Sequence, residues 1–153
     1  MEALLKKLNF KEQKQVVLYN LPADLGELAQ AFAVFASVYD QFHKVEKTDF
    51  SLSFCQKQEE VDAVATFLAV HTEGDAVVWV VYPKGTSKRY KCDFNRDTGW
   101  AKLGELGFEP VRQVAIDADW SALRFRRVSF IKTMTRSFAM TDEGKERIKK
   151  PPQ

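Results

Sequence analysis

The sequence predicts an α/β domain in which helices cover a mostly parallel sheet, and three observations lead to this fold class. The apolar run from Ala76 to Val81, closed by Pro83, is typical of a strand buried on both faces, as in parallel sheets. Segments with strand and helix patterns alternate along the chain. The last two strands are separated by the short turn ADWSA, which predicts an antiparallel pair.

The amino-terminal half predicts three strands and the first helices. Pro22 ends the first strand, and Asp24 can cap the helix after it, whose apolar stripe ends at Phe35. Acidic residues in the first turn favour the helix that precedes Gly74. In chain order, the predicted elements are a helical turn at 4–8, a strand at 15–21, the helix after Asp24, strands at 38–42 and 50–54, and a helix at 58–70.

The second half predicts a strand at 76–82, a basic loop, a third helix and two final strands at 111–116 and 123–130. The third helix begins at Asn95 or Asp97 and is closed by Gly107. One connection is short: about seven residues separate the second and third strands, fewer than a parallel crossover normally needs. Either the second strand is rudimentary or the connection runs as extended chain.

Composition and charge suit one α/β domain at residues 1–136 with a basic, flexible tail at 137–153. The chain has 153 residues and a formal net charge of +2. Residues 124–153 hold nine Lys or Arg and three Asp or Glu, which is more positive charge than the whole chain carries. Residues 1–123 are therefore mildly acidic. Beyond the alternating pattern of the last predicted strand, which ends at Arg127, the carboxyl-terminal end carries only two aromatic residues, Phe130 and Phe138, too few for a base-stacking surface. Nucleic acid is therefore not the expected partner.

Cysteine and histidine content predicts no metal site. Cys55 and Cys92 are far apart in the sequence, and His43 and His71 are the only histidines. Lysines interrupt residues 1–16, so we expect no signal peptide there, and no apolar run is long enough to span a membrane. We expect a cytoplasmic protein with reduced thiols.

Three segments carry a resemblance to known proteins: VVWVVYPKGTS, FNRDTGW and VAIDADWSALRFR. They resemble a bacterial family of unknown function that is related to class I, S-adenosylmethionine-dependent methyltransferases in degenerate form. The likeness covers residues 10–136. It implies a Rossmann or methyltransferase-like three-layer sandwich, with a mostly parallel sheet that ends in an antiparallel hairpin.

The resemblance also implies what a cofactor site would need. Methyltransferases of this fold follow the first strand with a glycine-rich turn, because only glycine lets backbone approach the cofactor closely. Here that strand leads into LPADLGEL, where Pro22 and Ala23 replace the first glycines. An acidic residue is expected at the end of the second strand; Asp40 and Glu46 lie nearby, but the sequence places neither there. We therefore expect no cofactor.

Candidate ligand-binding residues cluster after the fourth and fifth strands, because open parallel sheets bind ligands at the carboxyl ends of their strands. The loop after the fourth strand offers hydroxyl and cationic groups for an anion, and the next turn offers a tryptophan to cover a planar ligand. The alternatives are a solvated loop, a structural ion pair between Arg124 and Asp117, and a tryptophan that fills the edge of the sheet. The predicted residues are Lys84, Ser87, Lys88, Arg89, Arg96, Asp117, Trp120 and Arg124.

The sequence leaves three functions open and predicts no set of catalytic residues. The first is a non-catalytic module that binds a small anion or a partner protein at the carboxyl edge of the sheet. The second is a divergent S-adenosylmethionine-dependent methyltransferase that uses LPADLGEL without the glycines. The third is an accessory protein that binds nucleic acid non-specifically through phosphate contacts.

Overall fold

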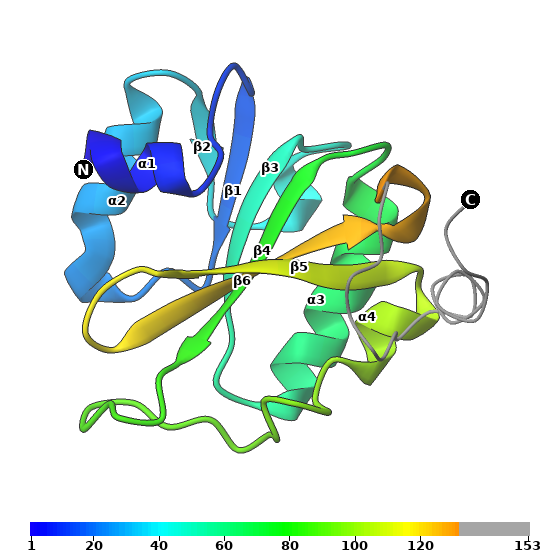
Figure 1. Ribbon diagram of the computed structural model, residues 1–153. Helices are drawn as coiled ribbons and strands as arrows, with labels where there is room; N and C mark the ends of the chain where they lie inside the picture. Colours follow the sequence, from blue (N-terminus) through cyan, green and yellow to red (C-terminus); the bar gives the residue numbers. More distant parts are fainter. Residues whose placement is uncertain (132–153) are drawn as a thin grey trace.

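A computed structural model describes residues 1–131 (Figure 1). The strands are β1 (Gln15–Tyr19), β2 (Ser37–Tyr39), β3 (Phe50–Phe54), β4 (Val77–Pro83), β5 (Phe108–Ala115) and β6 (Trp120–Arg127). The helices are α1 (Glu2–Lys7), α2 (Gly26–Ala33), α3 (Gln58–His71) and α4 (Ala101–Glu105), with 3-10 turns η1 (Ala23–Leu25), η2 (Phe42–Lys44) and η3 (Val128–Phe130). The predicted tail at 137–153, and the last residues of the predicted domain, lie outside the described part of the chain.

The six described strands form one sheet in the order β2-β1-β3-β4-β6-β5. The first four are parallel, while β6 runs antiparallel to both β4 and β5. The predicted fold class, with its mostly parallel sheet ending in an antiparallel pair, is confirmed.

Hydrophobic packing on the two faces of the sheet makes this a three-layer structure. On one face α1 and α2 cover a cluster built on Leu18, Leu52 and Trp79. On the other face α3 and α4 pack over a cluster that contains Val80 and Phe125 (Figure 1). All seven residues of β4 are buried, as expected for the central strand of such a sheet.

The short connection between the second and third strands is resolved by the strand order. β2 and β3 do not pair with each other, because they lie on opposite sides of β1. The chain passes between them through η2, and Phe42 and Val45 from this segment are buried in the same cluster as α3. The side chains of η2 thus cover the sheet where a crossover helix would otherwise do so. β2 itself has only three residues, so it is also rudimentary.

Several predicted boundaries were wrong for identifiable reasons. Phe35 does not lie on the buried stripe of α2, because the helix ends at Ala33 and Phe35 is 53% exposed. Asp24 makes no cap hydrogen bond and pairs with Arg89 instead. β5 and β6 each begin three residues earlier than predicted. Pro110 obscured the start of β5, and it is tolerated there because β5 is an edge of the described sheet.

No helix within residues 1–131 is long and apolar enough to cross a membrane.

Candidate functional site

The point where ligands are expected lies at the carboxyl ends of β1 and β3. β1 has β2 on one side and β3 on the other, so the connection after β1 leads to one side of the sheet and the connection after β3 leads to the other. Such a reversal opens a crevice between the loops at the carboxyl ends of the strands, and open α/β sheets bind ligands there. The site predicted from sequence lies further along the sheet, after β4 and β5.

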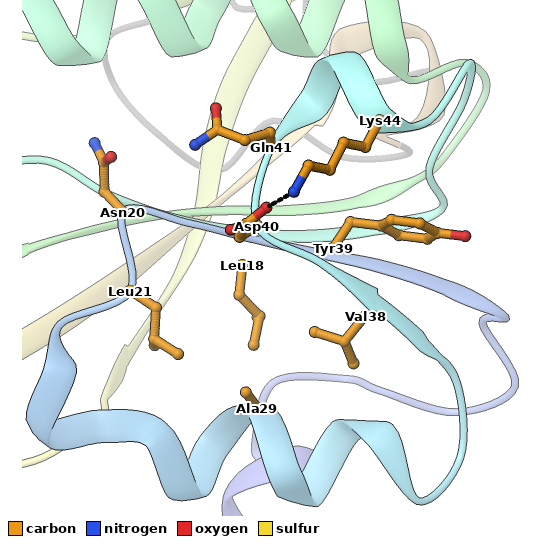
Figure 2. A pocket seen from close by; sticks show the side chains of 9 residues that line it. All are labelled: Leu18, Asn20, Leu21, Ala29, Val38, Tyr39, Asp40, Gln41 and Lys44. Atoms are coloured by element: carbon orange, nitrogen blue, oxygen red, sulfur yellow. Dashed lines mark hydrogen bonds and ion pairs between the residues drawn. The ribbon is translucent and has the colours of Figure 1, made fainter.

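A cavity of about 620 Å³ occupies this position, on the β2 side of the reversal. We call it the β1–β2 cavity. Its walls come from β1, β2, α2 and the segment that leads into η2 (Figure 2). Apolar side chains gather on the α2 side, and polar side chains lie above them. The lining residues are Leu18, Asn20, Leu21, Ala29, Val38, Tyr39, Asp40, Gln41 and Lys44.

Asp40 is the acidic residue of this cavity and the first residue after β2. Its carboxylate accepts a hydrogen bond of 2.7 Å from Nζ of Lys44, one helical turn further along the chain (Figure 2). This hydrogen bond and the charge of Lys44 lower the pKa of Asp40, so the carboxylate is ionised at neutral pH. Asp40 therefore offers free acceptor capacity at the mouth of the cavity.

The sequence suggested Asp40 as a candidate but did not place it at the end of the second strand. That strand was predicted to run to residue 42, whereas β2 ends at Tyr39. A useful signal was available. In dinucleotide-binding folds, the acidic residue that binds the ribose follows the first turn by about 20 residues. Asp40 stands at that separation from Asn20, the residue at which β1 turns.

The turn after β1 is built on Asn20, which has a φ of 56°. Asparagine tolerates this left-handed conformation better than other residues with a side chain. Its Nδ2 donates to the carbonyl oxygen of Phe54 at 3.3 Å and to Oε2 of Glu60 at 3.1 Å. Glu60 in turn accepts the backbone amides of Gln56 and Lys57 at the start of α3. One asparagine thus joins the carboxyl ends of β1 and β3 without a glycine.

Among the residues predicted from sequence, Ser87 and Arg89 belong to a network that fixes the loop after β4. Oγ of Ser87 donates to Oδ1 of Asp119 at 2.8 Å and accepts the amides of Arg89 and Tyr90. Arg89 pairs with Asp24 at 3.0 Å and lies 3.7 Å from Asp119. The loop after β4 is therefore tied to the loop after β1 by these contacts.

Asp117 and Trp120 have structural roles in the turn between β5 and β6. Oδ1 of Asp117 accepts the amides of Asp119 at 2.8 Å and Trp120 at 2.9 Å. Trp120 is 1% exposed and packs edge-on against Phe54, with 5.2 Å between ring centroids. The expectation that Trp120 covers a planar ligand was wrong, because its ring fills the edge of the sheet, as the alternative held.

Arg124 lies away from the other predicted residues. It sits in the middle of β6, in register with Trp79 and Arg112, roughly 13 Å along the strand from Trp120. Burial and the neighbouring charge of Arg126 lower the pKa of Arg124. No ion pair between Arg124 and Asp117 occurs in residues 1–131, and Nε of Arg124 is buried without a hydrogen-bond partner there.

The remaining predicted residues divide between solvent and a second, smaller cavity. Lys88 is exposed on the loop. Lys84 and Arg96 both line a cavity of about 240 Å³ beside the loop after β4. In the described residues, no three His, Cys, Asp or Glu side chains come close enough together to hold a metal ion.

Comparisons with known proteins agree with this fold. No protein-family model matches the sequence, and no curated protein sequence matches it. Among solved structures, a SAM-dependent methyltransferase from Aquifex aeolicus superposes with a TM-score of 0.55 at 10% identity, covering 83% of this chain and 89% of that one. The N-methyltransferase NodS from Bradyrhizobium japonicum gives 0.50 at 14% identity, covering 82% and 93%. NodS in complex with S-adenosyl-L-homocysteine gives 0.50 at 11% identity, covering 83% and 84%.

These likenesses show a class I methyltransferase-like fold, which the sequence resemblance implied. They also correct the expectation of no cofactor. Of these solved structures, the one from Aquifex aeolicus is described as SAM-dependent, and one of NodS is in complex with S-adenosyl-L-homocysteine, so absence of a cofactor does not follow from the fold. The sequence argument failed because it treated the missing glycines as decisive, whereas Asn20 makes the turn without them.

Proposed function

We propose that this chain is a divergent S-adenosylmethionine-dependent methyltransferase that holds the adenosyl part of the cofactor in the β1–β2 cavity. The observation that carries the proposal is the carboxylate of Asp40 at the end of β2, on the rim of a cavity beside the strand-order reversal. The two oxygens of a carboxylate can accept hydrogen bonds from two neighbouring ribose hydroxyls.

The rest of the cavity suits the other parts of an adenosyl group. Leu18, Leu21 and Val38 provide an apolar surface for the flat face of adenine. Gln41 provides an amide group, and Asn20 an amide oxygen, that can meet the polar edge of the base. The volume of about 620 Å³ lies in the range of small-molecule sites.

The cofactor would supply an electrophilic methyl group, and the protein's own residues would bind and orient it. Asp40 holds the ribose, the apolar wall holds the base, and Asn20 fixes the loop beside them by its bonds to Phe54 and Glu60. The contacts of Arg89 with Asp24 keep the loop after β4 next to the loop after β1.

The experiment is isothermal titration calorimetry with S-adenosylmethionine and S-adenosyl-L-homocysteine, and it compares Asp40→Asn with Lys44→Ala. Both substitutions break the same ion pair, but only the first removes the carboxylate. We expect Asp40→Asn to weaken binding at least tenfold. Lys44→Ala should preserve or strengthen binding, because the carboxylate of Asp40 then no longer has to give up its bond to Lys44 in order to accept the ribose hydroxyls.

Glu46→Gln is the matched control, since Glu46 is an exposed acid close to η2 that does not line the cavity. It should bind as the unmodified protein does. The proposal is wrong if neither ligand binds at about 1 mM, or if Asp40→Asn binds as well as Glu46→Gln.

A further inference from the structure

A second site lies at the loop after β4 and is formed by two adjoining cavities. The aromatic cavity, of about 860 Å³, is lined by Tyr82, Phe94, Asn95, Arg96, Asp97, Thr98, Trp100, Pro110, Gln113 and Leu123. The cationic cavity, of about 240 Å³, is lined by Pro83, Lys84, Gly85, Tyr90, Lys91, Cys92, Phe94 and Arg96. They share Phe94 and Arg96, so the two spaces meet at these side chains.

The aromatic cavity has free hydrogen-bonding groups beside buried rings, since Tyr82 is 7% exposed and Trp100 is 3% exposed. The rings of Tyr82 and Trp100 lie 5.4 Å apart, and Phe94 packs edge-on against Trp100 at 5.3 Å. Nε2 of Gln113 donates to the hydroxyl oxygen of Tyr82 at 2.9 Å. The tyrosine proton and the amide oxygen of Gln113 thus remain available to a ligand in the described structure. Burial raises the pKa of Tyr82, so its hydroxyl keeps that proton at neutral pH.

The cationic cavity brings together three positive charges: Lys84, Lys91 and Arg96. None of them forms an ion pair within residues 1–131. Gly85 makes room for the guanidinium, because a Cβ there would lie 2.7 Å from Nη1 of Arg96. Trp100 holds the backbone of Arg96 in place through a 2.7 Å bond from Nε1 to its carbonyl oxygen.

We infer that the two cavities form one binding site for a nucleotide. The polar edge of a planar base meets the Tyr82 hydroxyl and the Gln113 amide oxygen, and the phosphate lies among Lys84, Lys91 and Arg96. The orientation follows from charge, because Asp97 lines the aromatic cavity and would repel a phosphate there.

This site is distinct from the β1–β2 cavity and does not rest on the proposed methyltransferase activity. No residue lines both the β1–β2 cavity and either of these cavities. The two sites are separated in the sheet, since β2 is at one edge and β5 at the other. A base joined to a phosphate occurs both in a free mononucleotide and at the end of an RNA strand, so the ligand can be either of these.

The test is titration of the protein with AMP, GMP and UMP, followed by tryptophan fluorescence and calorimetry. Adenosine serves as the ligand without phosphate. Oligoribonucleotides with a 5′-phosphate or a 5′-hydroxyl show whether a strand end binds in place of a mononucleotide. All titrations are repeated in Asp40→Asn, so that any AMP held by the β1–β2 cavity is removed from the measurement.

We expect Arg96→Ala to weaken the binding of the phosphorylated ligands at least tenfold and to leave the melting temperature almost unchanged. Tyr82→Phe should weaken them by a few fold, since the ring remains and only the hydroxyl is lost. Lys88→Ala, an exposed cation of the same loop outside both cavities, should have no effect. Tighter binding of the 5′-phosphorylated strand than of AMP would identify RNA ends as the source of the ligand.

Three results would overturn the inference. The first is that no nucleotide or oligonucleotide binds at millimolar concentration. The second is that adenosine binds as tightly as AMP, which would remove the role of the cations. The third is that Lys88→Ala and Arg96→Ala weaken binding equally, which would indicate only diffuse attraction to a basic loop.

Discussion

Asp117 gives a sharp test of whether a residue predicted as a ligand contact has a structural role instead. Its Oδ1 accepts two backbone amides in the turn between β5 and β6, at 2.8 and 2.9 Å. Asp117→Ala removes the acceptor and leaves both amides to find water. Loss of a comparable side-chain cap costs about 0.5–2 kcal/mol. Because Trp120, which carries one of these amides, is buried, we expect the upper part of that range, about 1–2 kcal/mol.

The assay is urea unfolding at pH 7, supported by thermal melts. In a domain of this size, 1 kcal/mol corresponds to roughly 2–4 °C, so Asp117→Ala should lower the midpoint by roughly 2–8 °C. Asp117→Asn keeps an oxygen acceptor in the same place and should lose less than half as much stability. Glu46→Ala, which removes an exposed negative charge, is the control and should be nearly neutral.

Three outcomes would contradict this interpretation in different ways. If Asp117→Ala is as stable as Glu46→Ala, the two amides do not depend on the carboxylate. If it also weakens the binding of an anion, Asp117 contacts a ligand as the sequence suggested. Equal losses in Asp117→Ala and Asp117→Asn would show that the charge matters more than the acceptor geometry.

Three further predictions concern backbone, thiols and pH. Gly107→Ala should destabilise the fold by about 1–2 kcal/mol in urea unfolding, because the φ of 91° is costly for a residue with a Cβ; a neutral effect would contradict this conformation. In the native protein a thiol reagent should modify Cys92 and spare Cys55, since burial raises the pKa of the Cys55 thiol; rapid modification of both would contradict its burial. The affinity for S-adenosylmethionine should stay constant as the pH falls from 7 towards the usual Asp range, near pH 4, because Lys44 lowers the pKa of Asp40. In Lys44→Ala the loss of affinity should begin at higher pH, and titrations across this range will show whether the two proteins differ.

Much of the fold followed from local patterns in the sequence. The uninterrupted apolar run of β4 predicted a strand buried on both faces, and all of its residues are buried. Gly74 and Gly107 marked the ends of two helices, and both have positive φ in the structure. The short turn predicted at ADWSA indicated the antiparallel pair of β5 and β6, which the structure contains. These features depend on near neighbours in the chain, which is why the sequence alone could predict them.

The candidate site depended on contacts between distant segments, so the sequence could not place it. Asp40 becomes a cavity residue only because β2 ends at Tyr39, the residue before it, and because β2 lies beside β1. Lys84 and Arg96 share a cavity because the loop after β4 folds back on itself, whereas Arg124, predicted with them, is carried away along β6.

What the sequence by itself determined about this protein is its fold class, the succession of helices and strands along the chain in broad terms, and the basic character of the loop after β4. Only the tertiary structure decided which polar side chains share a space. It assigned Trp120 to the core and Asp117 to a turn, and it brought Asp40 to a cavity beside the strand reversal. The physical reason is that periodicity and turn residues act over a few positions, while a binding site is defined by strand order and by packing between residues far apart in the chain.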